Sequence, residues 1–356
     1  MKSAQLDRIL ERALEEQRIV GAVLAIAHRG EIAYERAIGD SDRETSQPMQ
    51  LRTLFRLASI SKPIVSAAAL ALIEQGRLHL DDSLEHWLPE FPPSITIRQL
   101  LTHTAGLGYC FWEEDGGPYH RANVSDGLDQ PGLSMEENLR RIASAPLVIP
   151  PGSAWRYSVA IDVLGAVLSK VCDQPLPELV AALVTAPLGM CDTAFHVVDR
   201  ARLAKPYMDG RPPKPMADPQ LLPYPTGAGI VFSPSRAFNE ASYPSGGVGM
   251  VGTAPDVLRF LEAIRQGPSA SEMMSNQIGD FTTTLPGWGF GYGGAVLLDP
   301  SATGTPQNPG TWSWGGVYGH RWFVDPASEI TSVLLTNTAF EGMNGQLPTD
   351  IRDALY

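Results

Sequence analysis

The chain has 356 residues, of which 44% are hydrophobic and 19% are charged, as in a folded protein with a full core. Its formal net charge of −12 argues against nucleic acid or an anionic membrane as a partner. The three cysteines have no spacing typical of metal ligands or of a disulfide framework.

The N-terminal segment, residues 1–18, is rich in charge and lacks the apolar stretch of a signal peptide. The apolar run from Val20 to Ala27 is too short to span a bilayer. We therefore expect a cytoplasmic protein. Apolar residues recur at helical spacing in the first segment, which predicts an amphipathic helix. These residues are Leu6, Ile9, Leu10 and Leu14.

Two strands are predicted next, Gly21–Arg29 and Glu31–Gly39, with a tight turn between them. So short a connection implies antiparallel pairing. Residues 59–75 are then predicted to form a helix rich in alanine and leucine. Pro63 stands in its first turn and Gly76 just beyond its end, which is the usual placement of these residues.

The middle of the chain is predicted to contain helices separated by long loops. The predicted helices are Ile97–Thr102, Ser134–Ala145, Ser158–Val171 and Leu176–Ala186. The proline-rich stretch 205–244 is predicted to form one long ordered surface loop at the rim of a cleft. A further helix over 254–266 begins after Thr253, a residue favoured at N-caps.

The C-terminal part is predicted to be rich in strands. They are Phe290–Leu298, Thr311–Gly316, His320–Val324 and Ile330–Asn337, followed by a helix over about Pro348–Leu355. Because strands occur only at the two ends of the chain, we expect an α/β (α+β) fold. One antiparallel sheet would be built from both termini and flanked by helices, with a mostly helical lobe inserted.

The predicted sheet domain is discontinuous and covers residues 1–56 and 245–356. The predicted helical domain, with long loops, covers residues 57–244. A cleft between two such lobes is a common place for a functional site, so we expect the active site there.

Ser59 and Lys62 stand three residues apart at the start of the predicted helix. At this spacing the two side chains share one helix face, so an amine can activate a hydroxyl that is otherwise a poor nucleophile. The free N–H groups at a helix N-terminus also favour negative charge. A serine and a lysine at this spacing are also common on helix surfaces. Whether Ser59 and Lys62 are catalytic therefore depends on the partner residues described next.

Tyr157 lies where a rigid loop, Pro150–Ser158, ends and a predicted helix begins. Its unperturbed pKa of about 10 is too high for a base, but we expect the Lys62 cation to lower that pKa. A Lys62/Tyr157 pair can then relay the serine proton. The alternative is a tyrosine that packs at a helix start.

Trp314, Gly315, Gly316 and Val317 form the third candidate motif. Two glycines weaken a strand and are typical of a close approach of a ligand to the backbone. We therefore expect the N–H groups of Ser59 and Val317 to form an oxyanion hole. The alternative is a tight bend or bulge of the sheet.

In motif order and approximate spacing, the chain resembles the penicillin-binding protein and class C β-lactamase superfamily of serine hydrolases. That superfamily uses the motifs S-x-x-K, Y-x-N and K-T-G. The resemblance extends over essentially the whole chain and includes the segment Leu100–Leu107. It implies a β-lactamase/DD-peptidase-like fold. We expect neither a metal nor a cofactor.

Two departures from these motifs narrow the prediction. Val159 stands where the β-lactamases have asparagine, and Trp314 where they have lysine. Loss of the ammonium removes the charge that a substrate carboxylate needs. The segments 157–165 and 314–320 instead resemble the family VIII carboxylesterases, which have a β-lactamase fold but cleave esters. No G-x-S-x-G motif occurs, so an α/β-hydrolase elbow is excluded.

The predicted function is hydrolysis of short-chain carboxylic esters through an acyl-enzyme on Ser59, with a small-molecule ester as the substrate. The predicted substrate-binding residues are Trp314, Gly315, Gly316, Tyr109, Val159 and Trp288. Phe111 and Trp112 could line the pocket or merely pack. His103 is expected to bond within its own turn, and Asp162 to bind backbone amides.

Several alternatives stay open at this point. A β-lactamase, a DD-peptidase, a D-amino-acid amidase or an acyltransferase would use the same catalytic groups. A non-turnover penicilloyl-binding module is the alternative of another class, because it would be acylated without releasing product.

Overall fold

The computed structural model describes residues 3–224 and 227–356 of the chain. Its main feature is an eight-stranded antiparallel sheet in the order β10-β11-β12-β13-β14-β1-β2-β3. The strands are β1 (Gly21–His28), β2 (Glu31–Asp42), β3 (Gln47–Pro48), β10 (Trp288–Phe290), β11 (Ala295–Leu297), β12 (Trp312–Gly316), β13 (His320–Asp325) and β14 (Ile330–Thr336).

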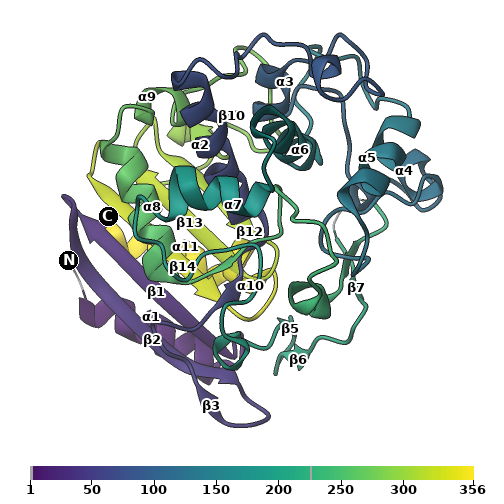
Figure 1. Ribbon diagram of the computed structural model, residues 1–356. Coiled ribbons are helices and arrows are strands. Elements are labelled where there is room, and N and C mark those ends of the chain that lie inside the picture. Colours follow the sequence, from purple (N-terminus) through teal and green to yellow (C-terminus); the bar gives the residue numbers. More distant parts are fainter. Residues whose placement is uncertain (1–2, 225–226) are drawn as a thin grey trace.

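The two ends of the chain meet in this sheet, where β1 pairs with β14 from Ala22↔Thr336 to His28↔Ile330. Figure 1 shows the purple N-terminal strands beside the yellow C-terminal ones. Residues 21–27 of β1 are all buried, as expected for an apolar strand that is covered on both faces. The predicted antiparallel sheet built from both ends of the chain is confirmed.

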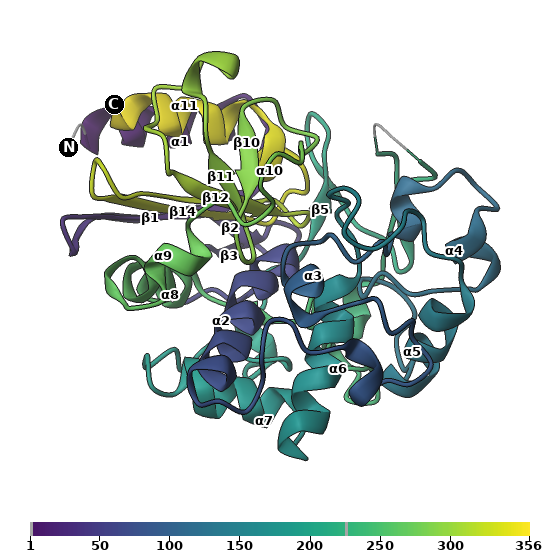
Figure 2. The ribbon, with the colours of Figure 1, turned by 90° about the horizontal axis from the view of Figure 1, so that it is seen from above.

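Helices cover both faces of the sheet, as Figure 2 shows edge-on. On one face lie α1 (Ser3–Glu15) and α11 (Gln346–Leu355), whose apolar side chains form a core of their own with the sheet. On the other face lie α8 (Ala254–Gln266), which contacts β1 and β14, and the short α9 (Ala270–Met273). Among the described residues, no helix is both long and apolar enough to cross a membrane.

The short α10 (Glu341–Asn344) contacts α11, β13 and β14, and the other α-helices lie on the α8 side of the sheet. They are α2 (Ser61–Glu74), α3 (Ile97–Leu101), α4 (Pro118–Arg121), α5 (Met135–Ser144), α6 (Ala160–Cys172) and α7 (Leu176–Val180). The central one is α2, which contacts α6 and α7 and is apolar on nearly all sides, as a buried helix must be. The proposed division of the chain at residues 57 and 244 stays a prediction.

One predicted strand, Phe290–Leu298, is wrong as a single element. The structure has two strands there, β10 and β11, which pair with each other across a tight turn. Gly293 in this turn has φ of +80°, and a β-carbon added to it would lie 2.4 Å from Cα of Pro63. The chain reverses here because only glycine fits against the start of α2.

The predicted single loop over 205–244 is also more structured than expected. It contains two short hairpins, β5 (Tyr207–Met208) with β6 (Lys214–Pro215), and β7 (Gln220–Leu222) with β8 (Ile230–Phe232). Residues 225 and 226 of the predicted loop lie outside the described residues.

Candidate active site

Ser59 lies on η1 (Ala58–Ile60), a single 3₁₀ turn between a short strand and α2. That strand, β4 (Phe55–Arg56), pairs with β9 (Val251–Gly252) and was not predicted. Ala58 has φ of +48°, a left-handed conformation that is costly for a residue with a side chain. The flanking strand pair and the buried helix hold the turn in this shape.

The structure brings Ser59, Lys62 and Tyr157 together. Lys62 Nζ lies 3.3 Å from Ser59 Oγ and donates to the carbonyl oxygen of Gly247 at 3.0 Å. The Tyr157 hydroxyl donates to Ser59 Oγ at 2.8 Å and accepts from Trp314 Nε1 at 3.1 Å. The serine oxygen therefore contacts both groups that could move its proton.

Burial decides the protonation of these two partners. It lowers the pKa of Lys62 to about 7, although Asp162 and Asp126 favour the ammonium. It raises the pKa of Tyr157 above its ordinary value. The expected lowering of the tyrosine pKa by Lys62 is therefore wrong, because the loss of hydration of the phenolate outweighs any nearby cation. Above about pH 7, a neutral amine and a protonated phenol therefore face Ser59.

The N–H groups of Ser59 and Val317 are free for a ligand. In the part of the chain that the structure describes, neither N–H donates to a backbone oxygen, and both residues line one cavity. A β-carbon at Gly316 would lie 2.6 Å from the carbonyl oxygen of Leu57. Gly316 is therefore needed because the backbone of the turn that carries Ser59 packs against it. The sequence had suggested that a ligand, and not the protein backbone, approaches this glycine.

The cavity beside Ser59 has a volume of about 140 Å³. Its wall is largely aromatic, formed by Tyr109, Phe111, Trp112, Trp155, Tyr157, Tyr224 and Trp314. Non-aromatic lining residues include Asp126, Leu128, Val248, Leu285, Gly315, Arg321, Met343 and Asn344. Such a wall suits an apolar acyl or alcohol group. Among the described residues, no group of three or more His, Cys, Asp or Glu side chains could hold a metal ion.

The beta-lactamase family model matches residues 6–356. The chain belongs to the beta-lactamase family. The predicted resemblance to this superfamily of serine hydrolases is thereby confirmed.

Relatives within the beta-lactamase family include esterases. Esterase EstB of Burkholderia gladioli is 51% identical over 372 aligned residues, which cover 99% of this chain and 95% of EstB. The solved structure of EstCE1, described as a hydrolase with promiscuous acyltransferase activity, matches with a TM-score of 0.96 and 47% identity, covering 99% of this chain and 98% of EstCE1.

A more distant structural match shows the fold alone. Unliganded simvastatin synthase LovD of Aspergillus terreus has a TM-score of 0.76 and 20% identity, and the match covers 99% of this chain and 97% of LovD.

Within this beta-lactamase-family site, three of the six predicted substrate-binding residues line the cavity. Tyr109, Trp314 and Gly315 do, as do Phe111 and Trp112, for which packing alone was the alternative. Gly316, Val159 and Trp288 do not. Val159 is fully buried at the start of α6 and donates its N–H to the carbonyl oxygen of Gly108. Trp288 lies in the edge strand β10, and β11 separates it from β12.

The His103 N–H bonds within its own turn, to the carbonyl oxygen of Leu100 at 3.3 Å, but the imidazole does not, so the prediction is wrong for the side chain. Its Nδ1 accepts from the Ser158 N–H at 3.2 Å, and its ring lies 4.8 Å from the ring of Tyr157. It therefore fixes the junction that carries Tyr157. Asp162 accepts from the hydroxyl of Ser245 and is buried beside Lys62.

Asp126 shapes the aromatic wall. Its carboxylate accepts from the N–H groups of Cys110 and Phe111, at 2.9 and 3.1 Å. Burial raises the pKa of this carboxyl, so the two backbone donors are the groups that favour its charged form. The segment that carries Tyr109, Phe111 and Trp112 is thereby tied to the segment that carries Asp126.

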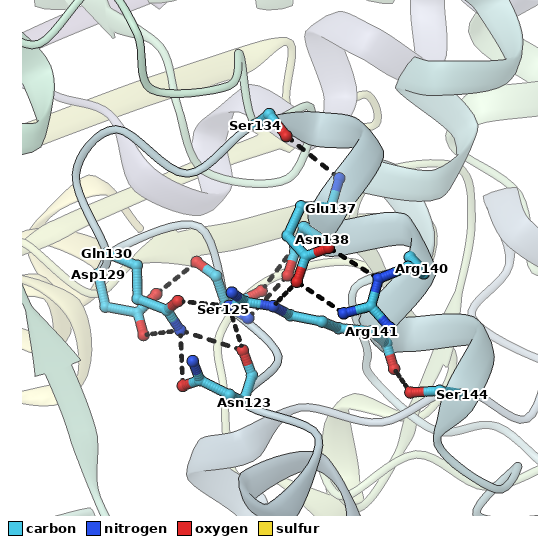
Figure 3. Close-up of polar contacts among 10 residues, drawn as sticks. All are labelled: Asn123, Ser125, Asp129, Gln130, Ser134, Glu137, Asn138, Arg140, Arg141 and Ser144. Atoms are coloured by element: carbon cyan, nitrogen blue, oxygen red, sulfur yellow. Dashed lines mark hydrogen bonds and ion pairs between the residues drawn. The ribbon is translucent and has the colours of Figure 1, made fainter.

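A polar network in turn fixes the segment around Asp126 (Figure 3). Asn138 of α5 accepts from the Ser125 N–H at 2.8 Å and donates to the Ser125 carbonyl oxygen at 3.1 Å. Arg141, one turn further along α5, donates to Gln130 Oε1 at 2.7 Å. This part of the cavity is therefore anchored to a helix before any substrate enters.

Proposed function

We propose that this chain hydrolyses short-chain carboxylic esters through an acyl-enzyme on Ser59. The observation that carries the proposal is the contact of Ser59 Oγ with the Lys62 amine, at 3.3 Å, and with the Tyr157 hydroxyl, at 2.8 Å. The aromatic wall of the cavity beside it suits an apolar acyl or alcohol group next to the reacting carbonyl. The 51% identity to EstB over nearly the whole chain confirms the broader prediction of a serine esterase of the beta-lactamase family.

In the acylation step, neutral Lys62 accepts the hydroxyl proton as Ser59 Oγ attacks the ester carbonyl carbon. The carbonyl oxygen becomes an oxyanion, which accepts hydrogen bonds from the Ser59 and Val317 N–H groups. Collapse of this intermediate breaks the ester bond and leaves the acyl group on Ser59.

Tyr157 acts in this scheme as the acid and not as the base. Because burial keeps its phenol protonated, it can give a proton to the departing alkoxide and recover one from Lys62, whose Nζ lies 4.7 Å from the tyrosine ring. Trp314 orients the phenol by donating to its oxygen. Water then takes the place of the alcohol and attacks the acyl carbonyl carbon. The acylation steps run in reverse, which releases the carboxylic acid and returns the proton to Ser59.

The pH dependence of kcat/KM follows from the pKa of Lys62. Protonated lysine cannot accept the serine proton, so we expect kcat/KM for ethyl butyrate to rise as the pH increases through about 7. Above that range it should stay level, because Tyr157 keeps its proton. The measurement is the initial rate by pH-stat from pH 5 to 9. A decline between pH 8 and 9, or a level profile down to pH 5, would contradict these assignments.

Substrate preference separates an esterase from a β-lactamase. Trp314 places a neutral indole where a β-lactamase has an ammonium, so wild type should prefer p-nitrophenyl acetate to nitrocefin. A lost charged hydrogen bond corresponds to about 10²-fold or more in kcat/KM. Trp314→Lys should raise the ratio of nitrocefin to p-nitrophenyl acetate.

Trp314→Phe is the matched control for that substitution, since it removes the bond to Tyr157 without adding charge. Both variants should lose overall activity, but only Trp314→Lys should shift the ratio. If wild type already favours nitrocefin, the esterase proposal fails and the β-lactamase alternative replaces it.

Acyl transfer is a second candidate activity, because an alcohol can replace water in attacking the acyl-enzyme. The 47% identity to EstCE1, described as a hydrolase with promiscuous acyltransferase activity, favours this possibility. Addition of methanol to p-nitrophenyl butyrate should then give methyl butyrate beside butyric acid. The predicted cytoplasmic location stays a prediction.

A further inference from the structure

Arg321 is a cation in the wall of the active-site cavity that the mechanism does not use. It lies on β13, opposite Gly315 of β12 in the strand register, and both residues line the cavity beside Ser59. Gly315 contributes no side chain there. The three residues that follow Arg321 in β13, Trp322, Phe323 and Val324, are apolar or aromatic and buried.

The guanidinium of Arg321 has no protein partner in the part of the chain that the structure describes. No hydrogen bond or carboxylate acts on it, and the one neighbouring charge is a second cation, Arg352. Loss of hydration and this like charge lower the pKa of Arg321 to about 10. By contrast, enclosed Arg18 pairs with Glu16 and Glu341.

Arg321 is partly buried, and a guanidinium that loses part of its hydration without gaining a partner is costly. It carries five N–H donors in a planar fork that matches a carboxylate. Arg321 lines the cavity, and its guanidinium has no acceptor among the described residues. An anion that arrives with the ligand would therefore complement it.

We propose that Arg321 binds a carboxylate of the substrate, so that the preferred esters carry a free carboxylate on their acyl or alcohol part. The inference rests on the proposed ester hydrolysis at Ser59. This site differs from the carboxylate site of β-lactamases, whose lysine is replaced by Trp314 of β12 in this chain, because Arg321 lies on the next strand, β13. A flexible chain can extend a carboxylate to that strand, whereas the carboxylate of a β-lactam is fixed on its rings close to the reacting carbonyl.

Two matched substrate pairs test this proposal. For the acyl side the pair is mono-p-nitrophenyl glutarate and p-nitrophenyl valerate. For the alcohol side the pair is 4-acetoxybenzoate and 4-acetoxybenzamide. The quantity measured is the ratio of kcat/KM for the anionic member to that for the neutral member, in wild type, Arg321→Lys and Arg321→Met.

We expect the ratio for at least one pair to fall by about 10-fold or more in Arg321→Met, and by less in Arg321→Lys. The pair that responds tells which side of the ester carries the carboxylate. Arg352→Gln is the control, since it removes the same charge from a residue that does not line the cavity, and its ratios should match wild type. Unchanged ratios in Arg321→Met, or an equal fall in Arg352→Gln, would overturn the proposal.

An inhibition assay on wild type gives a readout that does not depend on the folding of a variant. Glutarate should inhibit p-nitrophenyl valerate hydrolysis competitively, and added salt should weaken this inhibition. Glutaramide should inhibit far less. Equal inhibition by both compounds, or by neither, contradicts a carboxylate site. Failure of the Ser59 proposal is distinguishable, because Ser59→Ala would then still hydrolyse both members of each pair.

Discussion

Ester hydrolysis is expected to fall to the uncatalysed background when Ser59 is replaced by alanine. Ser59 supplies the only hydroxyl in the described structure that contacts both Lys62 and Tyr157, and no other group there can form the acyl-enzyme. Loss of a nucleophile of this kind lowers kcat by about 10⁴-fold or more. The measurement is kcat/KM for p-nitrophenyl butyrate, with circular dichroism as the check on folding.

Two serines of α2 provide matched controls for this substitution. Ser66 Oγ is buried and has no hydrogen-bond partner among the described residues, so Ser66→Ala should keep both fold and activity. Ser61 Oγ accepts from the Met250 N–H at 3.1 Å, so Ser61→Ala should cost about 1 kcal/mol of stability but keep catalysis. If Ser59→Ala stayed active and Ser61→Ala lost activity, the nucleophile would be misassigned.

The second large effect concerns Lys62 and Tyr157. Lys62→Ala and Tyr157→Phe should each lower kcat by about 10²-fold or more, the usual contribution of a general base or acid. Their effects should be far from multiplicative in the double variant, because both residues move the proton of the same serine. The measurement is a double-mutant cycle on kcat for p-nitrophenyl butyrate.

A double variant whose loss equals the product of the two single losses would argue that Lys62 and Tyr157 act independently. Ser66→Ala serves again as the control for a substitution within α2. Tyr157→Phe also isolates the phenol, because the aromatic contact with the His103 ring, 4.8 Å away, is retained.

The sequence was sufficient for the catalytic candidates because their chemistry depends on local spacing. Ser59 and Lys62 are one helical turn apart, and proline and glycine mark the helix that follows them. The sheet was equally accessible, since apolar strands joined by short turns appear only at the chain ends. The split of the predicted strand 290–298 was not accessible, because it depends on the contact between Gly293 and Pro63, far away in the sequence.

The wall of the cavity was harder to predict for the same reason. Val159 is next but one to Tyr157, yet it faces the core of α6 and not the cavity. Arg321 was missed, although a charged residue between buried aromatic neighbours in a predicted strand was a usable signal. The pKa of Tyr157 was predicted in the wrong direction because the sequence shows a neighbouring lysine but not how completely the site is buried.

The central claim is that Ser59 is acylated, and a phosphonate ester tests it most directly. A p-nitrophenyl alkylphosphonate should release one equivalent of p-nitrophenol per protein molecule, abolish ester hydrolysis, and leave a stable adduct that peptide mapping by mass spectrometry places on Ser59. The Ser59→Ala protein should remain unlabelled. An adduct on another residue, or hydrolysis that persists after complete labelling of Ser59, would contradict the claim.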